Sequence, residues 1–284
     1  KTIKIDGNVT ICLNGKQIQK VGNTTGSVFE VPAGNTLTLT DCTGKGQVTT
    51  NRNDNGSGVY VNGGILNLYS GQITQSYGQK GTGSNESNKY GGGVYVNNGG
   101  TFNMYGGTIT KNDANYGGGV YVKSGTFNMY GGTIENNTGS MGYNKLSFGG
   151  AGVYVEASGN FIMNNDASVT ENTIGYGSTG GAGVYVNGGT FEMHDNASVT
   201  GNKAHNSNSN GSCCGGVYVN SGTFTMNGNA SVTGNKATLG TLNGAGVYVL
   251  GGGTFTMNDK ASVSGNGNEA NTTYGGGVYL SLIH

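Results

Sequence analysis

The stretch Gly91-Gly-Gly-Val-Tyr-Val-Asn-Asn-Gly-Gly-Thr-Phe-Asn-Met-Tyr-Gly-Gly-Thr-Ile-Thr-Lys-Asn112 decides the fold of this chain. Apolar residues alternate with polar ones in three short segments, around Val94, Phe102 and Ile109, and glycine and asparagine separate the segments. Alternation with a period of two is typical of β-strands, whereas glycine and asparagine are typical of turns. The stretch therefore predicts three short strands joined by tight turns.

The same pattern recurs along the chain, each time opening on the word Gly-Val-Tyr-Val, which ends in Leu280 in its last copy. From the first valine to the second apolar segment, and from there to the third, the step is always seven or eight residues. Only the connection to the next unit varies in length. A fixed period indicates a repeat in which each unit buries its apolar face on the next. The opening valines are Val59, Val94, Val120, Val153, Val184, Val217, Val247 and Val278.

The composition agrees with a repeat of strands and turns. Among 284 residues there are 59 glycines, one proline and no tryptophan. Glycine at this density disfavours helices, so no helical crossover is expected between strands. Stacking unit on unit, strand above like strand, then gives a right-handed parallel β-helix, since crossovers between parallel strands are right-handed. We predict an all-β solenoid with three short strands per coil and nine to ten coils.

The chain is expected to form a single β-helix domain over residues 1–284. Residues 1–55 alternate in the same way but lack the repeated word, so they are expected to form degenerate N-terminal coils. Residues 56–280 are the regular coils. Residues 281–284 replace the expected next segment and are expected to be a truncation or junction tail.

Alternation assigns each side chain of the word to a face. The two valines of each word are expected to point into the solenoid, with the Phe and Met of the second segment, and the tyrosine between the valines to point outward. An asparagine follows most third segments by three residues, and stacked asparagines can bond one another in a ladder, which favours a structural role. These asparagines are Asn51, Asn112, Asn137, Asn172, Asn202, Asn235 and Asn266.

Three segments resemble repeats of known protein families: Val-Thr-Gly-Asn-Lys-Ala (residues 232–237), Gly-Ala-Gly-Val-Tyr-Val (244–249) and Gly-Gly-Thr-Phe-Thr-Met-Asn (252–258). They resemble repeats of bacterial adhesin-like surface proteins with pectin-lyase-type β-helices. They are also similar to the repeats of chlamydial polymorphic outer-membrane proteins, but with Ile or Val where Phe is expected, as in Ile109. The resemblance implies an extracellular or cell-surface protein, secreted or attached. We expect such a rod to present its variable loops and a tyrosine-lined face to a glycan or to a host or bacterial surface protein.

The outward tyrosines are the first candidate site. On stacked coils about 4.8 Å apart their rings form one column, which we interpret as a carbohydrate-binding platform with loops 77–90, 138–149 and 203–214 as walls. The alternative is that like side chains stack only to stabilise the sheet. The candidate ligand-binding residues are Tyr60, Tyr95, Tyr121, Tyr154, Tyr185, Tyr218 and Tyr248, and Tyr69, Tyr105 and Tyr130 predict a second column.

Two other function classes compete with binding. Polysaccharide lyases or hydrolases of this fold need clustered carboxylates, and the weak catalytic candidates are Asp166, Glu192, His194 and Asp195. A Thr-x-Thr array flanks the third segment, as at Thr108 and Thr110, and resembles ice-binding proteins. Because scattered polar residues and solvated strands explain both patterns, we expect a noncatalytic protein.

Charge and cysteines exclude further classes. The 14 basic and 14 acidic residues balance, and Arg52 is the only arginine, so no nucleic-acid partner is expected. No apolar run is long enough to span a membrane. The four cysteines (Cys12, Cys42, Cys213 and Cys214) form no CxxC motif and have no histidine at metal-ligand spacing, so neither metal nor cofactor is expected. Cys12 and Cys42 lie one coil apart, which leaves a disulfide or two thiols as alternatives.

Overall fold

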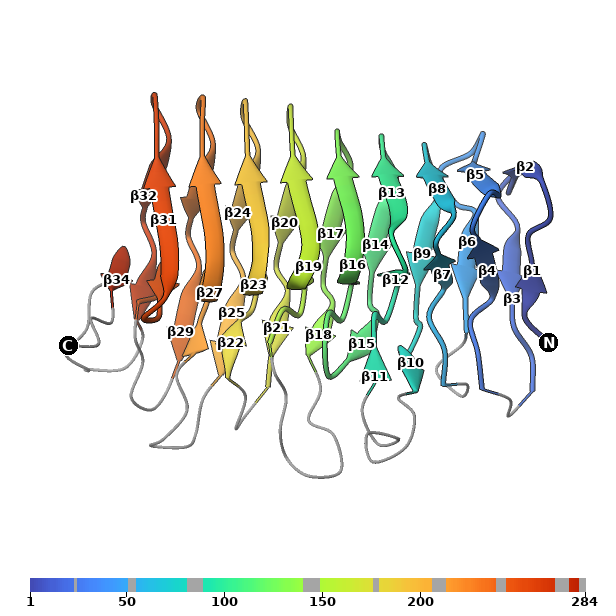
Figure 1. Cartoon of the computed structure of the whole chain (residues 1–284), viewed down its shortest axis with the longest axis horizontal. Coiled ribbons are helices and arrows are strands. Elements are labelled where there is room, and N and C mark those ends of the chain that lie inside the picture. Colours follow the sequence, from blue (N-terminus) through green and yellow to red (C-terminus); the bar gives the residue numbers. More distant parts are fainter. Residues whose placement is uncertain are drawn as a thin grey trace.

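The computed structural model of the chain describes residues 1–22, 25–50, 55–80, 89–139, 149–175, 179–205, 213–238, 244–268 and 276–280. Within these ranges all regular structure is β-strand, and coils stack along one axis with β1 (Ile3–Lys4) and β34 (Val278–Leu280) at opposite ends (Figure 1). The predicted class, an all-β parallel solenoid, is confirmed. The solenoid has about seven turns, slightly fewer than the nine to ten expected.

The first and second predicted segments form one large parallel sheet. In the central coils the two segments run together into single strands of ten or eleven residues, so the expected separate strands are joined there. The first row is β1 (Ile3–Lys4), β4 (Phe29–Pro32), β7 (Val59–Asn62), β12 (Val94–Asn97), β16 (Val120–Met129), β19 (Val153–Met163), β23 (Val184–Met193), β27 (Val217–Met226), β30 (Val247–Val249) and β34 (Val278–Leu280). The separate second-row strands are β2 (Asn8–Cys12), β5 (Thr36–Thr40), β8 (Ile65–Leu68), β13 (Gly100–Met104) and β31 (Gly253–Met257).

The third predicted segment forms a second sheet, and a row of short strands after it forms a third. The second sheet is β3 (Gln17–Gln19), β6 (Gln47–Thr49), β9 (Gln72–Thr74), β14 (Thr108–Thr110), β17 (Thr133–Glu135), β20 (Ser168–Thr170), β24 (Ser198–Thr200), β28 (Ser231–Thr233) and β32 (Ser262–Ser264). The third is β15 (Asp113–Ala114), β18 (Thr138–Gly139), β21 (Thr173–Ile174), β25 (Lys203–His205), β29 (Lys236–Thr238) and β33 (Gly267–Asn268).

Two strand pairs lie beside these sheets. The parallel pair β22 (Gly180–Gly181) and β26 (Cys213–Cys214) precedes two of the long strands. The antiparallel pair β10 (Gln79–Lys80) and β11 (Lys89–Tyr90) flanks one loop.

Identical residues stack in register from coil to coil. Val94 pairs with Val120, Tyr95 with Tyr121 and Val96 with Val122. These four valines are fully buried inside the solenoid, as predicted, whereas Val278 of the last word is 40% exposed. Behind them the phenylalanine rings stack face to face, with centroids 4.5 Å apart between Phe102 and Phe127. Because each coil offers the next the same side chain at the same height, one packing solution is repeated along the axis.

The predicted asparagine ladder is present and buried. Asn137 Nδ2 donates to Asn172 Oδ1 over 3.0 Å and to the carbonyl of Ile109 over 2.9 Å. The backbone amide of Asn137 donates to the same Oδ1 over 3.0 Å. The ladder continues through Asn112, Asn202, Asn235 and Asn266, whereas Asn51 lies outside the described residues. These amides satisfy backbone groups at the turn, which supports the structural role predicted for them.

Candidate functional site

The tyrosines of the repeated word point away from the valine core, as alternation predicted, but most of them are not exposed. Six of them, Tyr95, Tyr121, Tyr154, Tyr185, Tyr218 and Tyr248, expose between 2% and 7% of their surface. Tyr60 is half-buried. The expectation of an open tyrosine platform is therefore wrong for these six positions. Together with Cys214 they form an apolar cluster separate from the valine core.

A further layer of tyrosine covers this column over its middle coils. Tyr90, at the end of β11, and Tyr116, two residues after β15, stack on each other with centroids 4.9 Å apart. Tyr90 also lies 5.3 Å from Tyr121, and Tyr116 lies 5.3 Å from Tyr154, between ring centroids. Both belong to the connections between coils, where the repeat is least regular. These connections therefore fold back over the column and remove it from water.

The rings of the column change orientation in its middle. Near the N-terminal end Tyr60 and Tyr95 are stacked, with 27° between their planes. The angle rises to 66° between Tyr121 and Tyr154, and to 78° between Tyr154 and Tyr185. In an edge-to-face pair one ring turns its edge to the other, so its own faces are not covered by that neighbour. The stacked order ends at Tyr154, and the edge-to-face arrangement, in which the stack is open, continues to the pair Tyr185 and Tyr218 at 69°.

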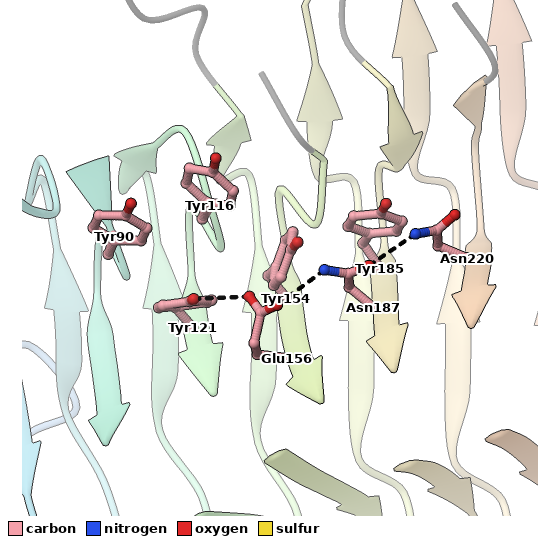
Figure 2. A pocket seen from close by; sticks show the side chains of 8 residues that line it. All are labelled: Tyr90, Tyr116, Tyr121, Tyr154, Glu156, Tyr185, Asn187 and Asn220. Atoms are coloured by element: carbon pink, nitrogen blue, oxygen red, sulfur yellow. Dashed lines mark hydrogen bonds between the residues drawn. The ribbon is translucent and has the colours of Figure 1, made fainter. Parts of the chain in front are cut away.

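A pocket of about 390 Å³ lies at this opening (Figure 2). Its volume falls in the usual range for small-molecule sites. Five tyrosines, one carboxylate and two amides line it: Tyr90, Tyr116, Tyr121, Tyr154, Tyr185, Glu156, Asn187 and Asn220.

Glu156 lies at the centre of the polar side of the pocket (Figure 2). The phenol of Tyr121 donates to Glu156 Oε2 over 2.9 Å, and Asn187 Nδ2 donates to Glu156 Oε1 over 2.9 Å. Asn220 Nδ2 in turn donates to Asn187 Oδ1 over 2.8 Å. Each oxygen of the carboxylate is thus held by a donor from a neighbouring coil, which fixes its orientation.

The backbone carries an irregularity at the same residue. Glu156 of β19 pairs with both Asn187 and Gly188 of β23, and the register shifts on either side of it. β19 has eleven residues where β23 has ten, so the extra residue is accommodated as a bulge. Bulges often re-aim a side chain beside a functional site. The carboxylate therefore sits where the strand departs from its repeat.

Burial and the carboxylate together suppress ionisation of the surrounding phenols. Burial first, and then the negative charge of Glu156, raise the pKa of Tyr121 and Tyr154 above the ordinary value. The same two causes raise the pKa of Tyr185. Burial, then Tyr90, then Glu156 raise the pKa of Tyr116 to about 12. The pocket thus combines neutral phenols with one carboxylate.

The loops predicted as walls are only partly described. Residues 81–88, 140–148 and 206–212 of these loops lie outside the described residues, as do residues 281–284 of the tail. Their described ends include Tyr90, which lines the pocket, and Cys214, which packs in the tyrosine cluster. The second predicted column, Tyr69, Tyr105 and Tyr130, is stacked and exposes 38% to 50% of each residue.

The structure brings together only two of the four weak catalytic candidates, Glu192 and His194. Glu192 Oε2 lies 3.1 Å from His194 Nε2, and both side chains are partly exposed. Asp195 instead accepts from the backbone amide of Asn165 over 2.9 Å, and Asp166 accepts from Asn196 Nδ2 over 3.1 Å. None of the four lines the tyrosine pocket. In the described part of the chain no group of three His, Cys, Asp or Glu residues is placed to hold a metal ion.

The remaining predicted features have varied surroundings. Cys12 and Cys42 are exposed, with their sulfur atoms 2.9 Å apart, whereas Cys213 and Cys214 are buried. On the second sheet Thr110 is only 6% exposed, so the Ser/Thr array is not uniformly open to solvent. Across the described ranges the chain has no helix long and apolar enough to cross a membrane.

Sequence reasoning missed five of the eight residues that line the pocket: Tyr90, Tyr116, Glu156, Asn187 and Asn220. Glu156 follows its word at a position held by asparagine in Asn62, Asn97, Asn187 and Asn220, and this substitution was a signal available in the repeat alignment. Tyr90 and Tyr116 each directly precede a Gly-Gly-Gly triplet, and this shared position was the signal for them.

Comparison with protein families, with curated proteins and with solved structures finds no match for this chain.

Proposed function

We propose that this chain is a noncatalytic β-solenoid of an adhesin-like cell-surface or secreted protein, and that it binds a glycan in the Glu156 pocket. The observation that carries the proposal is the convergence of five tyrosines and a hydrogen-bonded carboxylate on one pocket of about 390 Å³. Aromatic walls with a few placed polar groups are typical of small-molecule sites. A pyranose ring offers matching surfaces, since its C–H faces pack on aromatic rings and its hydroxyls bond carboxylates and amides.

The lining of the pocket supports binding over hydrolysis. Glycoside hydrolysis by the usual route needs two carboxyl groups about 5–9.5 Å apart across the scissile bond. Glu156 is the only carboxylate among the described lining residues, and both of its oxygens already accept hydrogen bonds. We therefore assign the carboxylate to ligand binding. The adhesin-like character and the location outside the cell rest on the resemblance of the repeats.

The test is retention of the labelled chain on an array of immobilised glycans of defined composition. Wild type is compared with Tyr185→Ala, which removes a wall, and with Asn187→Ala, which removes a donor to Glu156. Tyr248→Phe is the matched control, because Tyr248 belongs to the same column but does not line the pocket. We expect wild type and the control to bind one class of glycan, and both pocket variants to lose at least about tenfold in affinity.

Two results would contradict this function. One is the absence of glycan retention by the wild-type chain. The other is equal retention by all four proteins, provided that a separate thermal denaturation experiment shows each of them to be folded. Shortening of a soluble polysaccharide during the same incubation would instead point to an enzyme.

A further inference from the structure

The charged group in the described lining of the pocket is negative, and no positive side chain balances it there. The only formally charged residue of this lining is Glu156, and no Lys, Arg or His is among the described lining residues. Lys123 occupies the equivalent position on the preceding coil, but its side chain is exposed and does not line the pocket. The two donors to Glu156 are a neutral phenol and a neutral amide. They orient the carboxylate without cancelling its charge.

The tyrosine walls add to the same negative character. An aromatic ring has a negative face and a positive edge, so a cation is attracted to the face. At the two ends of the column stacked neighbours cover these faces, with 27° between the planes of Tyr60 and Tyr95 and 18° between those of Tyr248 and Tyr279. Around Tyr154 the planes stand at 66° to 78°, so neighbouring rings there are not stacked face to face, and five tyrosine rings line the pocket.

Several aromatic rings around one carboxylate form a site for a positively charged nitrogen. Recognition of ammonium ligands by aromatic cages is a well-attested use of cation–π attraction, and the attraction grows when the cation is desolvated. The burial of Tyr121, Tyr154 and Tyr185 supplies such a desolvated environment. A carboxylate at its floor adds a charge-assisted hydrogen bond to an N–H donor.

We propose that the Glu156 pocket binds the protonated amino group of an amino sugar, with the ammonium against the carboxylate and the faces of the surrounding tyrosines. This inference rests on the proposed glycan function and narrows its ligand. Anionic sugars are disfavoured, because the carboxylate repels them and no basic residue in the described lining offsets it. Neutral sugars leave the charge of Glu156 without a counterpart.

The experiment compares two oligosaccharides that differ only at nitrogen. The glucosamine tetramer carries free amines, and the N-acetylglucosamine tetramer carries neutral amides. Binding is measured by calorimetry at about pH 6, where an amine with a pKa near that of an α-amino group is protonated. Tetramethylammonium is titrated separately as a cation without a sugar. The proteins are wild type, Glu156→Gln, which keeps the shape of the side chain, and the control Tyr248→Phe.

We expect wild type and Tyr248→Phe to bind the glucosamine tetramer at least about tenfold more tightly than the acetylated tetramer. Glu156→Gln is expected to reduce this preference to about twofold or less, and added salt to weaken binding of the amine form. Equal binding of the two tetramers by wild type would overturn the amino-sugar inference and leave the glycan function standing. Binding of tetramethylammonium but of neither tetramer would overturn both the glycan function and the amino sugar.

Discussion

The phenol of Tyr121 lies 2.9 Å from Oε2 of Glu156 and donates to it across two neighbouring coils. This contact joins two features that the sequence keeps apart, the regular tyrosine of the word and an irregular acid two residues after the next tyrosine. The acid thereby influences the ionisation of the column. Through its charge it raises the pKa of Tyr121, Tyr154 and Tyr185, in addition to the larger effect of burial.

Replacing the acid should therefore change how these phenols titrate. Glu156→Gln is expected to lower the pKa of Tyr121, Tyr154 and Tyr185, because a neutral amide does not oppose a nearby phenolate. Their pKa values should still stay above the ordinary tyrosine value, since burial remains. The measurement is phenolate absorbance during an alkaline titration of the folded chain. Glu192→Gln, which removes a carboxylate outside the pocket, is the control, and identical titrations of both variants would contradict the coupling.

The same raised pKa values predict a loss of stability at high pH. Unfolded tyrosines release their protons near pH 10, whereas Tyr121, Tyr154, Tyr185 and Tyr218 remain neutral in the folded chain. Their contribution is complete below about pH 10 and is lost as the pH rises above it, because only the unfolded state then binds fewer protons. Above about pH 10, each such tyrosine therefore lowers the free energy of unfolding by up to about 1.4 kcal/mol for every further pH unit.

Urea unfolding at several pH values measures this loss. The midpoint should be nearly constant from neutral pH to about pH 9 and fall steeply above about pH 10. Tyr154→Phe, which removes one ionisable group and keeps the ring, should fall less steeply than wild type. A wild-type midpoint that stayed flat to about pH 11 would show that the column ionises in the folded state.

The sequence predicted the solenoid well because its fold depends on a period. Apolar residues equivalent to Val94, Phe102 and Ile109 recur in each unit at fixed steps, and an asparagine equivalent to Asn137 follows most third strands at the same distance. The core and the asparagine ladder could therefore be assigned from the pattern alone. The pocket depends on departures from that period. Glu156 is a single substitution, and Tyr90 and Tyr116 lie in connections whose path over the column no repeat describes. Burial of the column was missed for the same reason.

The asparagine ladder offers a direct test of a buried polar network. Asn172 Nδ2 donates to Asn202 Oδ1 and to the carbonyls of Ile134 and Thr170, each over 3.0 Å. Asn172→Ala leaves these buried groups without their donor, which costs about 1–3 kcal/mol for each unsatisfied group. We expect a loss of more than about 2 kcal/mol in chemical unfolding. Asn160→Ala changes an exposed asparagine and should stay within about 0.5 kcal/mol of wild type; equal losses would refute a structural ladder.

Replacing the glycine that opens a word with a residue that has a side chain should destabilise the fold. A Cβ on Gly183 would lie 2.8 Å from the carbonyl oxygen of Gly216 and 2.8 Å from Val199 Cγ1. Gly183→Ala therefore forces neighbouring coils apart, and overpacking of this kind costs about 1–3 kcal/mol. Gly175 is the matched control, since nothing lies within 4 Å of its Cβ position. Thermal denaturation should show a lower midpoint for Gly183→Ala only, and a comparable drop for Gly175→Ala would remove close approach as the cause.

The two pairs of cysteines should differ in reactivity. Cys12 and Cys42 are exposed with their sulfurs 2.9 Å apart, and the hydrogen bond from Cys42 lowers the pKa of the Cys12 thiol. Cys214 is fully buried, and burial raises the pKa of its thiol. Because the thiolate is the reactive form, and the Cys12 thiol raises the pKa of Cys42, a thiol reagent should modify exposed Cys12 before exposed Cys42 in the folded chain. It should modify Cys213 and Cys214 only after unfolding.

Oxidised glutathione should then join the exposed pair. The thiolate of Cys12 attacks the glutathione disulfide and releases one glutathione, and Cys42 displaces the second, so the two electrons and two protons end on two glutathione molecules. The product links β2 to the turn after β5, and a disulfide closing a loop of this kind typically adds about 2–4 kcal/mol. Peptide mapping by mass spectrometry should find the Cys12–Cys42 pair in wild type and a single glutathione adduct in Cys42→Ser. Recovery of stable adducts on both cysteines of the wild type would show that their geometry does not permit the bond.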